Sequence, residues 1–314
     1  MRLATWPQIE AALERLDPLA EMEAAFRAYS DGRAVVPPVG ELRFEDPPGD
    51  VHVKCGYVKG EEHYVVKIAS GFSANPERGL PSGDGLMLLF RQETGELDAL
   101  LLDRGKLTDL RTAAAGAVCA RHLAPSEVER IGILGTGAQA RSQVRLLRGV
   151  VACERVLAWG RRAKALEAYR EEMTAEGFEV ETTLDAREVA ASCDLIVTAT
   201  PATEPLLEAE WIRPGTHLTA VGSDTRGKQE LEAAVLARAD LVVADSLAQC
   251  RERGEIAHAL AAGLLREDEV VELGALLAGR ARGRTSDEEI TVADLTGVAV
   301  QDVRIASAVL RALA

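Results

Sequence analysis

The spacing of apolar and polar residues changes along this chain, and each pattern predicts a different kind of structure. Residues 18–31 place apolar side chains at helical intervals, and the Asp-Gly pair at 31–32 is typical of a helix end. Residues 51–103 instead contain runs rich in β-branched and aromatic residues, among them "VHVKCGYV" and "HYVVKIASGF". The segment "RQETGE" separates two further runs and is typical of a hairpin turn. A helix followed by an antiparallel sheet is therefore predicted.

A different pattern begins at Leu107, where the alanine-rich run "LTDLRTAAAGAVCARHLA" predicts a helix with Thr108 or Asp109 as its N-cap. Beyond "PSEVER", short apolar strands alternate with helices, one of them expected over residues 228–239, as is typical of a parallel doubly wound sheet. The expected strands are "RIGILG", "RVLAWG", "DLIVTAT", "HLTAVG", "DLVVADS" and "EITVADLT". The final segment, "GVAVQDVRIASAVLRALA", predicts an amphipathic helix that packs on the first part of the chain.

The predicted fold class is therefore α/β. It combines a Rossmann-type doubly wound parallel sheet with an N-terminal α+β domain that the C-terminal helix completes. We place the N-terminal domain at residues 1–124 with 298–314, and the Rossmann domain at residues 125–297. A chain of 314 residues is long enough for two such domains.

Composition narrows the classes of function. The chain is 47% hydrophobic and 27% charged, which is typical of a soluble globular protein, and it has no apolar run long enough to span a bilayer. The N-terminus lacks the apolar core of a signal peptide, so we expect a cytoplasmic protein. A formal net charge of −14, without a dominant cluster of Lys and Arg, argues against a nucleic-acid partner. The five cysteines and five histidines show no metal-ligand spacing, so no metal site is predicted.

The first chemical motif is "IGILGTGAQA", in which Gly135, Gly137 and Ala140 fit the pattern G-x-G-x-x-A. It follows a predicted strand and opens a predicted helix, which is the context of a dinucleotide-binding loop. Gly135 permits the tight turn, Gly137 lets the backbone approach a pyrophosphate, and Ala140 allows close packing of the helix on the strand. The helix N-terminus then offers amide N–H groups to the phosphates. A glycine-rich turn without a ligand is the alternative.

The end of the second predicted strand bears on which dinucleotide binds. A chain that binds NAD usually carries an acid there, which binds the ribose 2′-hydroxyl. Here the sequence reads "VLAWGRRAKAL", with Arg161 and Arg162 at that place and no acid after Trp159. Because a guanidinium suits a 2′-phosphate, NADP is the predicted cofactor and NAD the alternative. The arginines are otherwise the solvated start of a helix.

Four cations interrupt apolar or small-residue surroundings in the first part of the chain: Arg43, Lys54, Lys67 and Arg111. Buried charges need partners, and a substrate carboxylate is one such partner, which Arg binds with two hydrogen bonds. A structural ion pair with an acid of this chain is the alternative. Lys54 is also consistent with a solvent-facing position on an alternating strand.

The stretch "AVGSDTRGKQEL" turns abruptly polar after the strand "HLTAVG". Ligands of a doubly wound sheet bind beyond the carboxyl ends of its strands, so Asp224 should face the nicotinamide, where it can take and return a proton. The same residue types are good turn chemistry, and Asp224 is equally consistent with an N-cap or an Asx-turn before the helix expected at 228–239. The spacing alone leaves both interpretations open.

In this order the motifs resemble those of the ornithine cyclodeaminase/mu-crystallin family, over nearly the whole chain. The segments that carry the resemblance are "VVKIASGF", "NPERGLPSGDGLMLLF", "ETGELDALLLD", "LTDLRTAAAGA", "IGILGTGAQA", "AVGSDTRGKQEL" and "DLTGVAVQD". The resemblance implies a two-domain homodimer. It also implies that the N-terminal domain, joined by the C-terminal helix, forms the dimer interface and part of the substrate pocket, and that residues 125–297 bind the dinucleotide.

The resemblance also implies roles for single residues. Arg43, Lys67 and Arg111 match the positions that hold the substrate carboxylate. Lys67 further belongs to the catalytic set, together with Asp224 as the acid/base. The predicted cofactor-binding set is Thr112, Gly135, Gly137, Ala138, Gln139, Arg161, Arg162, Thr198, Thr200, Gly222, Lys228 and Thr296.

The sequence departs from the family pattern in two places. Lys54 stands where many relatives have an uncharged stretch, which bears on the distal end of the substrate. The absence of an acid after Trp159 is unlike the NAD-dependent cyclodeaminases and is similar to the NADP-using imine reductases and mu-crystallin-like members.

The activity that the resemblance implies is hydride transfer at the α-carbon of an amino or imino acid, as in an imine or ketimine reductase or an amino-acid dehydrogenase. The first alternative is an ornithine cyclodeaminase, a lyase that converts L-ornithine to L-proline and ammonia with a retained NAD. The second is a non-catalytic protein that binds NADP or another ligand, against which the intact set of Lys67, Arg111 and Asp224 argues. The expected partner is a small amino or imino acid, with no nucleic acid and no membrane.

Overall fold

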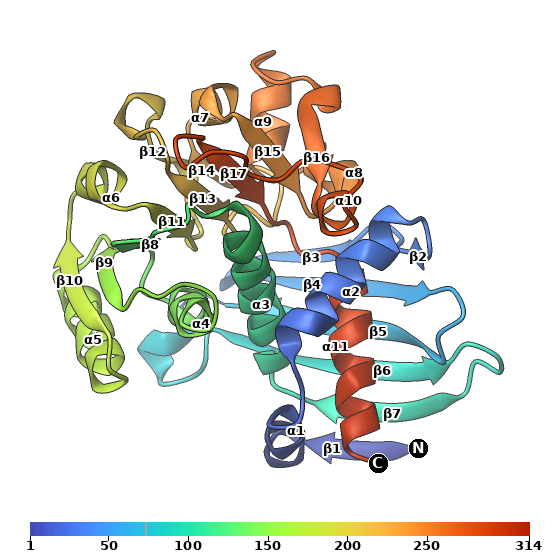
Figure 1. The fold of residues 1–314 in the computed structure, drawn as a ribbon. Helices are drawn as coiled ribbons and strands as arrows, with labels where there is room; N and C mark the ends of the chain where they lie inside the picture. The colour runs from blue at the N-terminus through green and yellow to red at the C-terminus, as the bar shows by residue number, and fades with distance from the viewer. Residues whose placement is uncertain (73) are drawn as a thin grey trace. The chain divides into compact units, whose positions relative to one another are not determined.

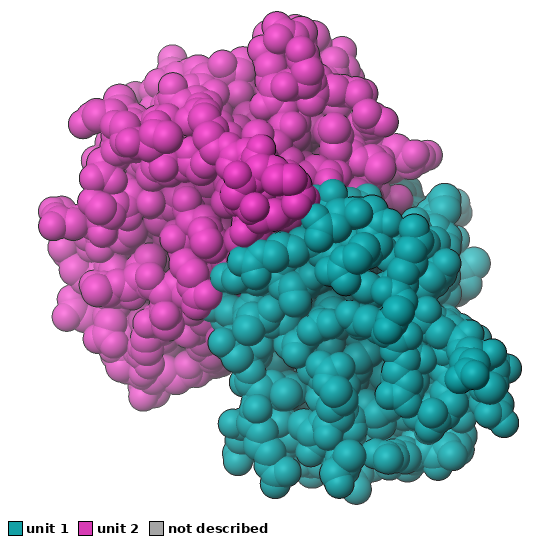
Figure 2. Space-filling model, turned by 45° about the vertical axis from the view of Figure 1, so that its right-hand side comes forward, with its two compact units in different colours: residues 1–111, 298–314 teal, residues 112–297 magenta. Residues whose placement is uncertain are grey.

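The computed structural model describes residues 1–72 and 74–314. They divide into two compact units, residues 1–111 with 298–314 and residues 112–297 (Figure 2). The division falls inside the helix α3 (Lys106–Leu123), whereas the sequence placed a domain boundary after residue 124, at the end of the same helix. Each unit has its own sheet, and the two are described separately.

The first unit is built on a sheet in which β1, β7, β6, β5, β4 and β2 follow one another, with β3 also paired to β4 (Figure 1). Neighbouring strands are antiparallel, except that β1 runs parallel to β7. The predicted antiparallel sheet is therefore confirmed. The strands are β1 (Arg2–Thr5), β2 (Ala34–Val35), β3 (Gly40–Glu45), β4 (Pro48–Val58), β5 (His63–Gly71), β6 (Gly83–Arg91) and β7 (Leu97–Leu102).

One face of this sheet, which we call the inner face, is covered by helices. They are α1 (Trp6–Leu13), α2 (Pro18–Ser30) and α11 (Ala299–Ala312), and α11 packs against α2 and the strands β4, β5 and β6 (Figure 1). The predicted first helix is α2. The Asp17 carboxylate accepts the N–H groups of Leu19 and Ala20 at its start, and Gly32 follows its end with a φ of 67°. The C-terminal helix thus completes the first unit, as predicted.

The opposite face, which we call the outer face, exposes apolar side chains. Val53 and Ile68 are directly paired across β4 and β5 and are 36% and 37% exposed. Leu42 and Phe44 of β3 are more exposed still. Because soluble monomers rarely expose an extended apolar patch, the outer face is a candidate for contact with another chain.

The second unit is built on a sheet of eight parallel strands in the order β10, β9, β8, β11, β13, β17, β15 and β16 (Figure 1). The strands are β8 (Ile131–Leu134), β9 (Arg155–Trp159), β10 (Glu179–Thr183), β11 (Leu195–Thr198), β13 (His217–Ala220), β15 (Leu241–Ala244), β16 (Val270–Glu272) and β17 (Thr291–Asp294). Most are buried along their whole length, which accounts for the continuous apolar runs in the sequence. The predicted Rossmann-type sheet is confirmed. A small separate sheet pairs β12 (Thr203–Leu207) with β14 (Gln229–Leu231).

The helices that alternate with these strands are α4 (Ala138–Leu147), α5 (Ala163–Ala175), α6 (Ala186–Ser192), α7 (Ala233–Arg238), α8 (Leu247–Cys250), α9 (Glu255–Ala261) and α10 (Leu273–Leu277). Short 3₁₀ segments are η1 (Asn75–Arg78) in the first unit, and η2 (Ala209–Trp211) and η3 (Glu267–Glu269) in the second. Within the described ranges, none of the helices has the length and apolar character needed to cross a bilayer.

Two local predictions were wrong. Thr108 and Asp109 lie inside α3, and the Asp103 carboxylate instead accepts the Leu107 N–H near the helix start, at 3.0 Å. The helix expected over 228–239 begins only at Ala233, after β14. The buried Glu255 carboxylate accepts the N–H groups of the second and third residues of β14, which holds them in an extended conformation.

Candidate functional site

The glycine loop after β8 lies where the strand order of the second unit reverses. The chain moves outward from β8 through β9 to β10, then returns to β11 on the other side of β8, and such a switch point is where doubly wound sheets bind ligands. Gly135 follows β8 with a φ of 124°, and a Cβ there would lie 2.6 Å from the carbonyl oxygen of Ala199, just beyond β11. A side chain does not fit, so the tight turn requires glycine.

Helix α4 begins directly after this loop, with Gly137 as its N-cap and no side chain capping its first amides. A Cβ on Gly137 would meet no atom within 4 Å, so the backbone there faces open space. Ala140 is fully buried, and α4 packs on β8 and β11. Ala138 and Gln139 contribute the first amides of the helix. Uncapped amides at the positive end of a helix dipole are suited to phosphate groups, so this loop fits a dinucleotide.

The end of β9 carries two exposed arginines near this loop. A Cβ on Gly160, which follows Trp159, would lie 3.0 Å from Cγ2 of Thr136 in the glycine loop. Arg161 and Arg162 come next and are exposed, and Arg162 is the N-cap of α5. Two guanidinium groups at this position are suited to a phosphate.

Thr198, Thr200 and Gly222 share one partner in the structure. The Thr198 hydroxyl donates to Oε2 of Glu230 at 2.7 Å. Thr200 donates to Oε1 of Glu230 through its hydroxyl at 2.7 Å and its N–H at 2.6 Å, and the Gly222 N–H donates to Oε2 at 2.9 Å. A hydrogen bond from these groups to a cofactor stays a prediction.

Thr112 and Thr296 take part in packing within the second unit. The Thr112 carbonyl accepts a hydrogen bond from Nε2 of Gln143 at 3.2 Å, which joins α3 to α4. The Thr296 hydroxyl donates to the Asp245 carboxylate at 3.0 Å and accepts from Nε2 of Gln249 at 2.8 Å. Contacts of either threonine with a cofactor also stay predictions.

The loop between β13 and β14 places Asp224 and Lys228 side by side. Nζ of Lys228 lies 2.7 Å from Oδ1 of Asp224, to which the Thr225 hydroxyl also donates at 3.1 Å. These two contacts hold the Asp224 carboxylate, and its side chain is 41% exposed. Asp224 lies beyond the carboxyl end of β13, the edge at which parallel sheets bind ligands. Because β14 follows rather than a helix, an N-cap role for Asp224 is excluded.

The inner face of the first unit buries charged groups around Asp302 of α11. Nζ of Lys67 on β5 lies 3.0 Å from the Asp302 carboxylate, and Nε of Arg111 on α3 donates to Oδ1 of Asp302 at 3.2 Å. Arg111 also donates from Nη1 to Oε1 of Gln301 at 3.3 Å. Lys67, Arg111 and Asp302 are 2%, 5% and 1% exposed. The structure therefore brings Lys67 and Arg111 together, through an acid of this chain.

Lys54 is the third cation of this cluster. It lies directly opposite Lys67 across β4 and β5, and it is 6% exposed, so the solvent-facing position considered for it was wrong. Alternation places it on the same face of β4 as the buried Gly56 and Val58, which α11 covers. The cation cluster, as we call it, comprises Lys54, Lys67 and Arg111 around Asp302.

Arg43 lies apart from the cation cluster. It is paired with Asp50, four residues before Lys54 on β4, which is about 13 Å along a strand. Its side chain is 59% exposed and lies 3.6 Å from the Glu41 carboxylate. The structure does not bring Arg43 close to Lys67. The third cation beside Lys67 and Arg111 is Lys54.

Burial controls the protonation of the cation cluster. It lowers the pKa of Lys67 to about 7; Asp302 opposes this shift, and Arg111 and Lys54 add to it. Burial alone would raise the pKa of Asp302, but the charges of the three basic residues outweigh it and the pKa falls below its ordinary value. Asp302 is therefore ionised at neutral pH. Basic groups that are gathered in the interior in this way are suited to a further anion.

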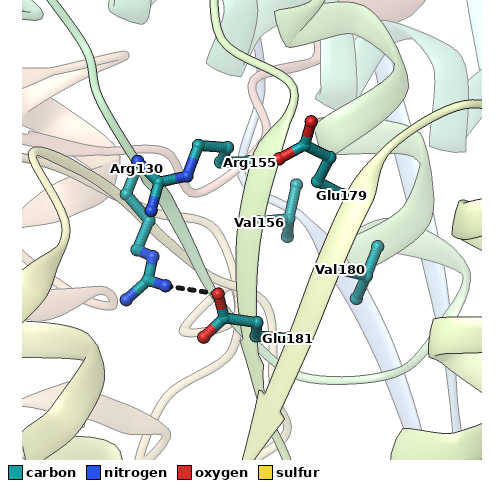
Figure 3. Close-up of a pocket in the computed structure, with 6 residues that line it drawn as sticks. All are labelled: Arg130, Arg155, Val156, Glu179, Val180 and Glu181. Atoms are coloured by element: carbon teal, nitrogen blue, oxygen red, sulfur yellow. Dashed lines mark hydrogen bonds and ion pairs between the residues drawn. The ribbon is translucent and has the colours of Figure 1, made fainter.

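Figure 3 shows a pocket in the second unit at the opposite edge of the sheet from the glycine loop. It lies at the amino ends of β9 and β10, and the Arg130 guanidinium beside it pairs with Glu181 at 2.6 Å. Ligands of parallel sheets bind at the carboxyl ends, so we do not assign the site to it. Its lining residues are Arg130, Arg155, Val156, Glu179, Val180 and Glu181.

Glu62, His63 and Asp98 lie close enough together to hold a metal ion. The guanidinium of Arg91 already pairs with Glu62 at 3.1 Å and with Asp98 at 3.3 Å, which satisfies both carboxylates without a metal. All cysteines in the described ranges are free thiols.

Sequence reasoning missed Asp302, around which the cation cluster forms, and Glu230, which accepts the hydrogen bonds of Thr198, Thr200 and Gly222. A signal in the sequence was present for Asp302 and not for Glu230. Gln301 and Asp302 form a polar pair between apolar residues near the start of α11, and a polar pair that is buried needs partners. Glu230 stands before Leu231 in "GKQEL", where it reads as an ordinary surface acid of a helix.

Comparison with known proteins places this geometry in a family. The model of the ornithine cyclodeaminase/mu-crystallin family matches residues 2–313. The chain is 45% identical over 295 residues to an uncharacterised cyclodeaminase of Sinorhizobium fredii, and the match covers 93% of this chain and 89% of that relative.

Two solved structures are similar over nearly the whole chain. An archaeal alanine dehydrogenase dimer with bound NAD has a TM-score of 0.89 and 34% identity, covering 99% of this chain and 95% of that one. The delta(1)-pyrroline-2-carboxylate reductase of Thermococcus litoralis, in complex with NADH and L-proline, has a TM-score of 0.93 and 30% identity, covering 99% and 97%. These similarities confirm the predicted fold class.

Replacing Asp302 with asparagine tests the energetics of the cation cluster. The change removes the carboxylate that Lys67 and Arg111 share and lowers the pKa of Lys67 further, because Asp302 raises that pKa. We expect the free energy of unfolding to fall by about 3–5 kcal/mol, the cost of breaking a buried ion pair from one side. Urea denaturation measures it.

The loss from Asp302→Asn should be larger at about pH 6 than at about pH 8. In the unfolded chain Lys67 has its ordinary pKa, so unfolding binds a proton wherever the folded lysine is neutral, and stability then rises with pH. The native lysine becomes neutral only above about pH 7, whereas that of the variant is neutral at lower pH, so only the variant gains stability between pH 6 and 7. Glu10→Gln, which removes an exposed charge on α1, is the matched control. Equal losses at both pH values would contradict this assignment.

Proposed function

We propose a function from the premise that this chain belongs to the ornithine cyclodeaminase/mu-crystallin family. It is an NAD(P)-dependent oxidoreductase that transfers a hydride at the α-carbon of an amino or imino acid. The observation that carries the proposal is the cation cluster, in which Lys54, Lys67 and Arg111 gather around the carboxylate of Asp302. A buried group of basic side chains is suited to the carboxylate of such a substrate.

In this proposal Lys67 and Arg111 hold the substrate carboxylate. The pKa of Lys67 is about 7, so the lysine is partly neutral at neutral pH, and a bound anion favours its charged form. Binding an anion therefore takes up a proton at Nζ of Lys67. Asp302 and Gln301 fix the Arg111 guanidinium, which reduces the conformational freedom that substrate binding would otherwise cost. We assign the first unit to substrate binding and the second to the dinucleotide.

Asp224 is the proposed acid/base. Its carboxylate takes and returns the proton of the substrate nitrogen, and the ammonium of Lys228 at 2.7 Å holds it in place. The nicotinamide dinucleotide supplies the hydride when it is bound. The amides at the start of α4 would hold its phosphates, at a helix end that no side chain caps.

Lys54 separates this proposal from the second candidate, ornithine cyclodeamination. Ornithine carries an ammonium at the end of its side chain, and a second buried cation beside the carboxylate-binding groups disfavours it by charge repulsion. A substrate with a neutral or anionic side chain suits the cluster better. A cyclodeaminase among the similar proteins keeps ornithine as the substrate to be tested against.

A protein that only binds a ligand is the third candidate. Such a protein would not need the partly exposed Asp224 carboxylate that lies beside Lys228 beyond the carboxyl end of β13. We therefore rank it below both enzymes.

For the cofactor, we propose NADP in preference to NAD. Arg161 and Arg162 stand where an acid would bind the ribose 2′-hydroxyl of NAD, and their guanidinium groups are exposed and suited to a 2′-phosphate. The two similar structures were solved with NAD and NADH, so the preference rests on these two side chains.

We also propose that the chain forms a homodimer through the outer face of the first unit. The exposed Val53, Ile68, Leu42 and Phe44 form an apolar surface, and the similar alanine dehydrogenase is a dimer. Packing this surface against a second copy removes it from water, and apolar side chains need no charged partner there.

Substrate assays with NADPH test the activity directly. We expect net NADPH oxidation with a cyclic imino acid, or with a 2-oxo acid plus ammonia or an amine. Ammonia release from ornithine without net consumption of the dinucleotide would instead support the cyclodeaminase. Binding of NADPH without turnover of any of these substrates would leave the binding protein.

Asp224→Asn tests the acid/base. We expect kcat to fall by about 10²–10⁴-fold, the usual contribution of general acid–base catalysis, while the Kd for NADPH stays nearly unchanged. Arg226→Gln is the control on the same loop, since its exposed side chain pairs with Glu252 and not with Asp224. A full kcat in Asp224→Asn would remove Asp224 from the mechanism.

The double variant Arg161→Ala/Arg162→Ala tests the cofactor preference. The loss of charge-assisted hydrogen bonds to the 2′-phosphate should lower kcat/KM for NADPH by about 10–10²-fold, with little change for NADH. Lys164→Ala, which removes an exposed cation from the next turn, should change neither. Equal losses with both dinucleotides would show that the arginines do not read the 2′-phosphate.

Ile68→Asp tests the dimer. A charge in the middle of the outer face should prevent burial of that face and give a monomer of 33.6 kDa in sedimentation analysis. Leu184→Asp is the control, because Leu184 is an exposed apolar residue of the second unit, and it should leave the oligomeric state unchanged. A dimer that survives Ile68→Asp would place the interface elsewhere.

A further inference from the structure

Glu230 is a fully buried acid between the ends of two strands of the second unit. Each of its carboxylate oxygens accepts two hydrogen bonds: Oε1 from the hydroxyl and N–H of Thr200, and Oε2 from the Thr198 hydroxyl and the Gly222 N–H. Thr198 is the last residue of β11 and Thr200 lies just beyond it, whereas Gly222 lies beyond β13. One side chain therefore ties together two neighbouring strand ends at the edge where the sheet binds ligands.

The loop from Gly222 to Glu230 carries Asp224 and Lys228, and it is held at both ends. At its start the Gly222 N–H binds the Glu230 side chain, and at its end the Glu230 N–H donates to the Glu255 carboxylate at 2.9 Å. Glu255 also accepts the Leu231 N–H at 3.0 Å and the Ser223 hydroxyl. The loop is thus closed on itself by the Glu230 side chain.

Two further residues hold the loop backbone where the reactive side chains leave it. Nη1 of Arg253 donates to the Asp224 carbonyl at 3.3 Å. Nε2 of His258 lies 2.9 Å from the Lys228 carbonyl. These contacts hold the backbone at both residues, and the Asp224 and Lys228 side chains meet each other at 2.7 Å.

We propose that Glu230 is a positioning residue of the reaction: by tying Thr198, Thr200 and Gly222 together, it sets the place of the Asp224 carboxylate. The inference rests on the proposed function, because it assigns to Glu230 an effect that acts through Asp224. Glu230 itself does not contact the reacting atoms in this proposal.

The close fit at Gly222 shows how narrowly this position is determined. A Cβ on Gly222 would lie 2.5 Å from Oε2 of Glu230 and 2.2 Å from the Thr200 carbonyl oxygen. The loop therefore approaches the carboxylate as closely as a backbone without a side chain permits. A longer or differently directed group at residue 230 has no room unless the loop moves, and Asp224 moves with it.

Hydrogen bonds donated to the carboxylate favour its ionised form, and two of the four come from the backbone N–H groups of Thr200 and Gly222, which can only donate. Burial, followed by the charge of Glu255, acts the other way and raises the pKa of Glu230 to about 7. The site thus holds a charge that is costly to bury, and the four hydrogen bonds offset that cost.

Glu230→Gln tests the proposal, because glutamine has the same shape but turns an NH₂ group towards two of the donors. We expect kcat to fall by about 10²-fold, the effect of a displaced catalytic group, with the Kd for NADPH within about threefold of the native value. Glu232→Gln is the matched control: its carboxylate also accepts a backbone N–H, from Ala209 at 2.7 Å, but does not hold the loop. Its kcat should be unchanged.

A double-mutant cycle with Asp224→Asn separates positioning from a general structural role. If Glu230 acts through Asp224, Glu230→Gln costs nothing further in kcat once Asp224 is replaced. Losses that multiply in the double variant would overturn the proposal, and so would a native kcat in Glu230→Gln. A native kcat in Asp224→Asn is a different outcome, which refutes the proposed function of Asp224 and the inference with it.

Hydrogen exchange supplies a readout that does not depend on activity. In Glu230→Gln, amides of residues 220–231 should exchange faster, while those of β8 keep their native rates. If Glu230→Gln does not fold, Glu230→Asp keeps the charge but shortens the side chain by one methylene. It should show the same non-additivity with Asp224→Asn, and additive losses there would equally overturn the proposal.

Discussion

The ion pair that Asp302 makes with Lys67 and Arg111 constrains the first unit more than any other contact that we describe. Charges taken out of water are stable only when partners surround them, and here a single carboxylate serves two cations at 3.0 and 3.2 Å. The acid belongs to the last helix of the chain, whereas Lys67 belongs to an early strand. The sheet of the first unit therefore buries its cations only when α11 has packed on it, and the two ends of the sequence form one structure.

The second unit buries acids rather than cations, and these charges are likewise surrounded by partners. Glu230 and Glu255 are buried acids whose oxygens are filled by hydroxyl and backbone N–H donors from strand ends and from the loop beyond β13. Asp294 accepts the Ile256 N–H at 2.8 Å in the same way, and burial raises its pKa well above the ordinary value. The regular backbone hydrogen bonds of a sheet stop where its strands end. Beyond that point these acids accept the backbone N–H groups instead, so the loops that contain the candidate site residues are held in one conformation as the strands are.

The extent to which this structure follows from sequence differs between its parts for physical reasons. Parallel strands such as β8 and β11 are buried on both faces, so each is a continuous apolar run that is easily recognised. Alternation in β4 shows two faces but not which of them a helix covers, and this is why a solvent-facing position stayed open as an alternative for Lys54. The segment at β14 has a helical composition, and its extended backbone is explained by partners distant in sequence, the Glu255 carboxylate and the paired strand β12. A local pattern can show that a residue such as Asp302 needs partners, but it does not show which residues tertiary folding brings to it. Roles of the single site residues stay predictions.

The overall charge and the local charge of this protein oppose each other. A formal net charge of −14 repels an anionic substrate at long range, but salt screens such repulsion beyond about 10 Å. Affinity for an anion must therefore arise locally, and the two places that offer it differ in kind. The cation cluster is buried, so its charges act at low dielectric and are little affected by salt, whereas Arg161 and Arg162 are exposed and screened. In the function that we propose, recognition of the substrate carboxylate thus belongs to the interior of the first unit, while discrimination between dinucleotides belongs to two surface side chains that can be replaced without disturbing the core.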